Sequence, residues 1–407
     1  MKKIQDAQLY LQKMNADGWL IYDFHGNNEL GRHFLEIPLH MISTRRFFYW
    51  IPAHGDPIKL VHAIEPNILD SCPGEKRLFL SWQSLRDQLR NLLKGAKRVA
   101  MEYSPDNMIP YVSRVDAGTV DLIRSFEIEV VSSGGFLPHF TAVISDEQGQ
   151  SHIRAGRILE RIVSEAWIMV GDHLKSGKTI TDSAVQQKLI SDFTRENLVS
   201  DSPPIVAVNS RCGDPHYANS SKNSIAIRKG DFLLIDIWAK ENKPKSIYGD
   251  ITHVAVAAER PTEKQKKIFN IVRRAQIAAT ELVVNRFAQK KELCGWEVDE
   301  CARTVIREAG YGEFFIHRTG HNIGESVHGS GANMDNLEMH DVRPVLLSTC
   351  FSIEPGIYLP GNSACVWSTI SMYIKTVVWR LWAAHKMRLS RFYNFLLRSS
   401  GLLSMIS

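Results

Sequence analysis

The sequence predicts an α/β (α+β) protein: a mixed-sheet N-terminal domain followed by a second domain with long helices. The 407 residues suffice for two hydrophobic cores. Hydrophobic residues make up 44% of the chain and charged residues 23%, which is typical of a soluble globular protein. Short apolar segments rich in aromatic and β-branched residues dominate the first third, and segments with a helical period follow. We place the domains at 1–150 and 151–361, with a separate tail at 362–407.

The N-terminal domain combines predicted strands and helices. Its strands are bounded by turn signals, of which His54-Gly55-Asp56-Pro57 is one. A polar stretch at 146–150 predicts the domain boundary. The expected strands are 18–24, 45–53, 57–63 and 98–103, and the expected helices are 79–94 and 115–125.

The second domain begins with residues 152–173, whose apolar positions repeat with a helical period. A further helix is expected to start near Thr181. Thr262 and Gln265 form a capping box ahead of a helix that runs to about residue 288, and Gly310 closes another helix over 297–309. The segments IVAVNS, FLLIDIW, THVAVAA and CFSIEPGIYL are expected to be strands.

Charge and cysteine usage exclude several classes of protein. The formal net charge is +5, but residues 362–407 contain six Lys or Arg and no Asp or Glu, so the remainder has 43 basic and 44 acidic residues. The main body therefore offers no basic surface for nucleic acid. We find neither a leader peptide nor an apolar run long enough to span a membrane. Six scattered cysteines without a CxxC pair favour a reduced, cytoplasmic protein.

Two aspartates are the first candidates for a site. Asp236 in LLIDIW is placed at the end of one predicted strand, and Asp250 in YGDITH just before the next. A hairpin with a long loop would bring the two carboxylates face to face, where they repel each other unless a cation lies between them. Two loop-end aspartates exposed to water are the simpler alternative for this pair alone.

Three histidines and a glutamate follow. His317, His321 and His328 lie within twelve positions, and the glycines around His321 allow close backbone approach. Glu354 lies in the otherwise apolar segment CFSIEPGIYL, so its carboxylate needs a buried partner, most simply a metal ion or an arginine. Carboxylates and imidazole together are the ligands of a divalent-metal site that activates water.

Taken in this order, these segments resemble the creatinase/aminopeptidase, or pita-bread, metallopeptidase family, and most closely its Xaa-Pro aminopeptidases and Xaa-Pro dipeptidases. The resemblance covers roughly 155–361 with specific motifs; residues 1–150 resemble the family's N-terminal domain more weakly. It implies hydrolysis of Xaa-Pro peptide bonds by a water activated by two divalent metal ions (manganese, or cobalt or zinc). It also implies a proline-containing peptide as the substrate and a possible homodimer.

By position in the family motifs, Asp236 would hold one metal ion and Asp250 would bridge both. His321 and Glu354 would hold the second ion, and Glu354 would also accept a proton from the attacking water. His216 would steady the reacting carbonyl, and His317 and His328 would line the proline-side pocket, with His328 also counted among the catalytic residues. The resemblance does not choose between aminopeptidase and dipeptidase.

The family's fifth ligand, a bridging Glu in a Gly-hydrophobic-Arg-hydrophobic-Glu motif, has no counterpart in this chain. No Glu follows Glu354, and three of the nine tryptophans lie in the tail. Back-translation of Gly361 to Leu389 with synonymous codons, read from the third base, permits EFGVRLEYDLYVHKDGRVEV, which contains the motif. We therefore predict a change of reading frame near Gly361, with the missing Glu at about Ser368, poor metal binding and impaired activity.

Three alternatives remain at this stage. A genuine basic, amphipathic tail would bind a membrane surface. A creatinase-like hydrolase would act without metal. A pseudoenzyme would only bind its ligand. The two aspartates, His321 and Glu354 favour the metallopeptidase, since metal-free relatives have little need of all four.

Overall fold

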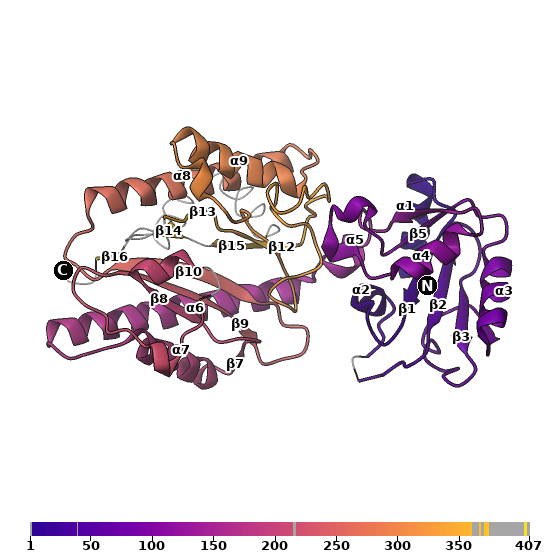
Figure 1. Cartoon of the computed structure of the whole chain (residues 1–407), viewed down its shortest axis with the longest axis horizontal. Coiled ribbons are helices and arrows are strands. Elements are labelled where there is room, and N and C mark those ends of the chain that lie inside the picture. The colour runs from indigo at the N-terminus through magenta and orange to yellow at the C-terminus, as the bar shows by residue number, and fades with distance from the viewer. Residues whose placement is uncertain are drawn as a thin grey trace. The chain divides into compact units, whose positions relative to one another are not determined.

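In a computed structural model, the chain is described over residues 2–38, 40–214 and 217–359, together with the backbone of three short strands further on. The chain divides into two compact units, Met1–Thr141 and Ala142–Ser407, each with its own sheets and helices (Figure 1). Both units mix strands and helices, which confirms the predicted α/β class.

The first unit is a six-stranded sheet with the order β4-β3-β2-β1-β5-β6. β2 runs antiparallel to its two neighbours, and the remaining strands are parallel to one another. The strands are β1 (Gly18–Asp23), β2 (Phe47–Pro52), β3 (Ile58–His62), β4 (Glu75–Phe79), β5 (Arg98–Met101) and β6 (Glu129–Ser132). The helices are α1 (Lys2–Lys13), α2 (Glu29–Phe34), α3 (Trp82–Leu92), α4 (Ala117–Arg124) and α5 (Pro138–Thr141).

The side chains of β1 alternate between two hydrophobic clusters, which explains how this sheet is buried on both faces. Trp19 and Ile21 belong to one hydrophobic cluster, and Leu20 and Tyr22 belong to another. Successive side chains of a strand point to opposite faces, so a single apolar strand supplies two cores. The sequence analysis missed β4 and β6, because β4 is mostly charged and exposed and β6 has only four residues.

Four long helices belong to the second unit: α6 (Asp146–Lys175), α7 (Asp182–Arg195), α8 (Glu263–Ala288) and α9 (Gly295–Glu308). The stretch 146–150, expected to be a polar break, is instead the first turn of α6. Ser145 and Gln148 form a capping box there, which explains why polar residues start a helix at this point. The capping box predicted at Thr262 and Gln265 begins α8.

The strands of the second unit form three groups. β7 (Leu198–Val199), β8 (Ile205–Val208), β9 (Phe232–Glu241), β10 (Gly249–Val256) and β16 (Leu403–Ser404) form a five-stranded sheet in which β9 and β10 are an antiparallel pair. β12 (Cys350–Ile353) lies between β11 (Asn322–Ile323) and β15 (Ile370–Tyr373), and β13 (Gly356–Ile357) pairs with β14 (Val366–Trp367). Short 3-10 helices occupy 105–107, 110–112, 209–213, 221–223 and 312–314.

These strands lie between two layers of helices. In Figure 1, α6 and α7 lie on one side of β9 and β10, and α8 and α9 lie on the other side. The side chains of β9 follow this arrangement: Phe232 and Leu234 join the core with α8 and α9, whereas Leu233 and Ile235 join the core with α6 and α7. Burial on both faces is the reason that β9 reads as a continuous apolar run.

Two further facts bear on the expectations from composition. Within the described ranges, no helix is both long and apolar enough to cross a bilayer. No disulfide joins the five cysteines that the structure describes. The alternative of a membrane-binding amphipathic helix concerns residues beyond Tyr373. These residues lie outside the described part of the chain, apart from the backbone of β16.

The contact between α6 and β10 yields a prediction on stability. A Cβ atom built on Gly249 would lie 2.8 Å from the backbone nitrogen of Gly156. To make room for it, the backbone of β10 or of α6 would have to shift. We expect Gly249→Ala to lower the free energy of unfolding by about 1–3 kcal/mol through overpacking. Gly156→Ala is the matched control, because a Cβ there meets no atom within 4 Å and alanine favours the helix by about 1 kcal/mol. Urea unfolding of both variants measures the difference, and equal destabilisation would contradict this account.

Candidate metal centre

The pairing of β9 with β10 places the two aspartates on one face of the sheet. Asp236 pairs with Thr252, and Asp250 pairs with Trp238, so the aspartates occupy diagonal positions of the ladder. Side chains at such positions point to the same face. Both residues lie inside their strands, and the turn between the strands spans 242–248. The expectations that Asp236 ends one strand and that Asp250 precedes the next are therefore wrong. Both side chains are buried, which excludes the alternative of solvent-exposed loop residues.

His321 and Glu354 come from two segments that approach each other closely. Asn322 of β11 pairs with Phe351 of β12, His321 immediately precedes β11, and Glu354 immediately follows β12. A Cβ atom on Gly320 would lie 2.1 Å from the carbonyl oxygen of Ser352, so this approach requires glycine.

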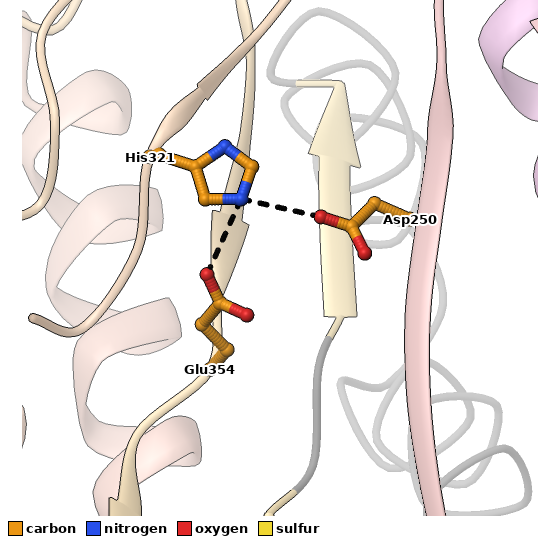
Figure 2. Close-up of side chains that lie close together, drawn as sticks. All are labelled: Asp250, His321 and Glu354. Carbon is orange, nitrogen blue, oxygen red and sulfur yellow. Dashed lines mark ion pairs between the residues drawn. The ribbon is translucent and has the colours of Figure 1, made fainter. Parts of the chain in front are cut away.

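Asp250, His321 and Glu354 converge on one point (Figure 2). Nε2 of His321 lies 3.3 Å from Oδ2 of Asp250 and 3.4 Å from Oε1 of Glu354. One potential ligand atom from each residue falls within 4.8 Å of the others, and all three side chains are buried. Asp236 lies beside this group rather than within it: its charge acts on Glu354, and the charge of Asp250 acts on Asp236 in turn.

Two hydroxyl groups orient the carboxylates. Thr252 donates a hydrogen bond of 2.6 Å to Oδ1 of Asp236, and Ser352 donates one of 2.8 Å to Oε1 of Glu354. Ser352 also accepts a hydrogen bond of 3.0 Å from the backbone N–H of His321, so one hydroxyl links two members of the cluster. The sequence analysis missed both residues. Each lies two positions from a predicted ligand on a strand, and this period of two could have identified them.

Burial dominates the electrostatics of the carboxylates. It raises the pKa of Asp236, and the nearby charge of Asp250 raises it further, whereas the hydrogen bond from Thr252 acts in the opposite direction. Burial alone raises the pKa of Asp250. Burial also raises the pKa of Glu354, which His321 lowers and the two aspartates raise. Three ionisable carboxyl groups thus share a space with little water to solvate their charge.

The imidazole of His321 suits a metal ion. Burial lowers its pKa, which favours the neutral ring, although the charge of Glu354 acts in the opposite direction. Nδ1 lies 3.2 Å from the backbone carbonyl oxygen of Asn322. A proton on Nδ1 donates to that carbonyl and leaves the Nε2 lone pair facing Asp250 and Glu354. Oxygen and nitrogen donors that converge in this way fit a divalent ion.

The other predicted histidines divide between the described and the undescribed residues. The ring of His328 meets that of His321 edge to face, with 4.4 Å between the centroids, and burial together with the charges of His321 and Arg318 lowers its pKa to about 3. His317 lies near enough for its charge to act on His328, and its ring centroid is 6.4 Å from that of Tyr358. His216 and Ser368 lie outside the described residues.

Arg318 is a further residue that the sequence analysis missed. Its side chain is buried, and its Nη1 atom lies 3.8 Å from Oε2 of Glu338. The charge of Arg318 lowers the pKa of both His321 and His328. The sequence signal was an arginine inside the segment HRTGHNIG, and the structure shows that it is buried, which is rare for arginine without a specific partner.

Comparison with known proteins agrees with this geometry. A profile of metallopeptidase family M24 matches residues 150–376, more than half of the chain, and this segment contains Asp236, Asp250, His321 and Glu354. The chain belongs to metallopeptidase family M24. The predicted family is therefore confirmed.

Two Xaa-Pro dipeptidases match part of this chain in sequence. An Xaa-Pro dipeptidase from Pyrococcus furiosus is 36% identical over 156 residues, which cover 38% of this chain and 40% of the relative. An Xaa-Pro dipeptidase from Lactobacillus helveticus is 34% identical over 159 residues, covering 39% of this chain and 38% of the relative. The matched part thus spans about two fifths of the length of each of these relatives.

Solved structures resemble the chain over most of its length. A prolidase from Thermococcus sibiricus superposes with a TM-score of 0.58 at 21% identity, covering 91% of this chain and 93% of that one. The dipeptidase PepE from Mycobacterium ulcerans gives a TM-score of 0.63 at 20% identity, covering 91% of both chains. At this level of identity the likeness concerns the fold, and it confirms the pita-bread architecture of the M24 family.

The raised carboxyl pKa values predict how the stability of the metal-free protein depends on pH. Because the folded protein holds protons that the unfolded chain releases, the free energy of unfolding should fall as pH rises from the ordinary carboxyl pKa of about 4 through the raised values. The slope is up to about 1.4 kcal/mol per pH unit for each proton. Urea unfolding in the presence of a chelator measures it, and Asp236→Asn should make it shallower. Glu263→Gln, which alters an exposed pair, is the control; equal slopes in all three proteins would contradict the prediction.

Proposed function

We propose that this M24 protein is a metal-dependent exopeptidase of the Xaa-Pro dipeptidase or Xaa-Pro aminopeptidase type. The convergence of Asp250, His321 and Glu354 in a buried space carries the proposal, since these donors suit a divalent ion and are costly to bury without one. The names of the Pyrococcus and Lactobacillus relatives support the choice of Xaa-Pro peptides as substrates. A cytoplasmic location remains part of the proposal.

The ligand set would hold two divalent ions, with manganese the first candidate and cobalt or zinc the others. Asp236 is assigned to one ion, Asp250 to both, and His321 and Glu354 to the second. Bound ions of this kind lower the pKa of water and polarise a carbonyl oxygen. Thr252 and Ser352 keep the carboxylates of Asp236 and Glu354 oriented for this role.

The remaining residues would act on the substrate and on protons. Glu354 is assigned as the proton acceptor, because its carboxylate faces the cluster and its raised pKa brings proton uptake closer to neutral pH. His328 is a neutral imidazole beside His321 and can form a hydrogen bond with the reacting carbonyl group. His216 is assigned to binding the substrate at the reacting carbonyl, and His317, together with His328, to the proline side of the substrate.

We further propose that the activity of this chain is impaired. The assigned set lacks a second carboxylate shared by both ions, and the position where the family has it, near Ser368, belongs to the predicted change of reading frame after Gly361. Without a second shared carboxylate, Asp250 alone would offset the repulsion between two bound ions. Weak metal binding and slow turnover are the expected consequences.

Metal binding is the first test of this proposal. Manganese added to chelator-treated protein should raise the thermal midpoint, because an ion that binds only the folded state stabilises it by mass action. Asp250→Asn and His321→Ala should each remove that stabilisation, whereas His340→Ala, which alters an exposed histidine paired with Asn336, should retain it. An increase of equal size in Asp250→Asn would refute the assigned ligands. Hydrolysis of an Xaa-Pro dipeptide that persists in excess chelator would instead favour a metal-free hydrolase.

The tail provides the second test. A variant in which the residues from Gly361 onward are replaced by the alternative-frame sequence with GVRLE should bind manganese more tightly and cleave an Xaa-Pro dipeptide faster. The same replacement with glutamine at the last position of GVRLE is the control, because it restores the strand without the carboxylate. Cleavage by the original chain at a rate equal to that of the restored variant would show that the fifth ligand is dispensable.

A further inference from the structure

The first unit has a pocket at one edge of its sheet. β1, β3 and β4 are parallel and end at this edge at Asp23, His62 and Phe79, while the antiparallel β2 begins there at Phe47. The helices α3 and α4 begin beside the same edge, at Trp82 and Ala117. In open α/β sheets, ligands bind outside the carboxyl ends of parallel strands, so the topology places this pocket where ligand sites usually form.

The pocket has the size and lining of a small-molecule site. Its volume is about 900 Å³, near the upper end of the usual range of about 300–1,000 Å³ for ligand pockets. All of its lining residues belong to the first unit, so it is separate from the metal centre.

Positive charge predominates in the lining. Arg45, Arg46 and Arg114 contribute guanidinium groups, and Asp116 is the only lining carboxylate. Asp116 accepts hydrogen bonds from the backbone N–H and the hydroxyl of Thr119 at 2.8 Å each, and its charge raises the pKa of Tyr22. Arg114 is paired with Glu29 at 2.7 Å and Glu65 lies beside Arg45, so Arg46 is the cationic group of the lining that is left for an anionic ligand.

Arg46 is the arginine best placed to bind that ligand. Arg114 donates to Glu29 and to backbone carbonyls, and Arg45 donates to Thr44. In the described part of the chain, Arg46 has neither an ion pair nor a hydrogen bond from its guanidinium group. Burial raises the pKa of Tyr22 to about 12 and the charge of Arg46 opposes that shift, so this guanidinium lies close to the phenol in the pocket lining. Five N–H donors in a planar fork suit a carboxylate or a phosphate.

Apolar side chains lie beside the cations. Trp82, at the first turn of α3, is 68% exposed, Leu80 is 71% exposed, and Phe24 is 39% exposed. All three line the pocket. A large aromatic side chain left this exposed offers a flat surface for a ring of the ligand and a low loss of conformational entropy on binding.

We infer that this pocket binds a small organic anion in which a carboxylate or phosphate group is attached to an aromatic ring. The guanidinium of Arg46 binds the oxyanion, and the indole of Trp82 packs against the ring. This function is independent of the proposed peptidase activity, because no residue of the pocket belongs to the metal centre.

Ligand-observed NMR titration of the full chain tests this inference with three probes that share one ring. Phenyl phosphate and phenylacetate carry the two oxyanions, and benzyl alcohol carries none. We expect at least one anion to bind about tenfold more tightly than the alcohol, and the stronger of the two anions identifies the oxyanion. Arg46→Gln should abolish the preference for the anion over the alcohol. Trp82→Ala should weaken the binding of every probe that binds, because all three carry the ring. Arg90→Gln, on α3 but outside the pocket, should change nothing.

Three results would overturn the inference. The first is binding of neither anion more tightly than benzyl alcohol. The second is that Arg90→Gln and Arg46→Gln weaken the binding of the anionic probes equally. The third is a change in the oligomeric state on Arg46→Gln, measured by light scattering at the same protein concentration, because a second copy of the chain would then occupy the pocket. Matching thermal midpoints of the variants exclude unfolding as the cause of any loss.

Discussion

The second unit depends on one constraint: three carboxyl groups and an imidazole share a buried space in which their charges cannot be solvated by water. Asp236, Asp250 and Glu354 have raised pKa values because of that burial, and His321 is held neutral by the same cause. Isolated buried charges are strongly unfavourable, so such a cluster persists only when protons or cations neutralise it. The surrounding fold keeps these four side chains together, so that either protons or cations can neutralise their charge.

Several features of the fold hold these four side chains at their positions. The diagonal register of β9 and β10 aligns the two aspartates, and the hydroxyls of Thr252 and Ser352 fix the carboxylate groups. Gly320 allows the histidine segment to pass close to the carbonyl of Ser352, which brings His321 to Glu354. A shift of any one of these supporting residues would separate donors that lie about 3.3 Å apart.

The sequence predicted which side chains converge better than it predicted their surroundings. Glu354 was identified because a charged residue inside an apolar segment requires a partner. Asp250 was identified because a hairpin would bring it to Asp236, and His321 because glycines flank it within a group of three histidines; the family motif fixed their order. The location of Asp236 inside its strand was missed, because a sequence does not reveal how far a buried strand continues past a polar residue. β4 and β6 were missed because neither has the apolar pattern of a buried strand, and 146–150 was misread because a capping box and a linker have similar compositions. The orienting hydroxyls become evident only once the register is known.

Proton release on metal binding tests the central claim most directly. If the buried carboxyl groups hold protons in the metal-free protein, manganese must displace them, and calorimetric titration in buffers of different ionisation enthalpy counts the protons released. The account predicts release of about one proton or more per protein near neutral pH, falling as pH rises through the raised carboxyl pKa values. Manganese binding at Asp250, His321 and Glu354 with no proton release at neutral pH would contradict it, because the carboxylates would then have been ionised and stable in the folded protein without a cation.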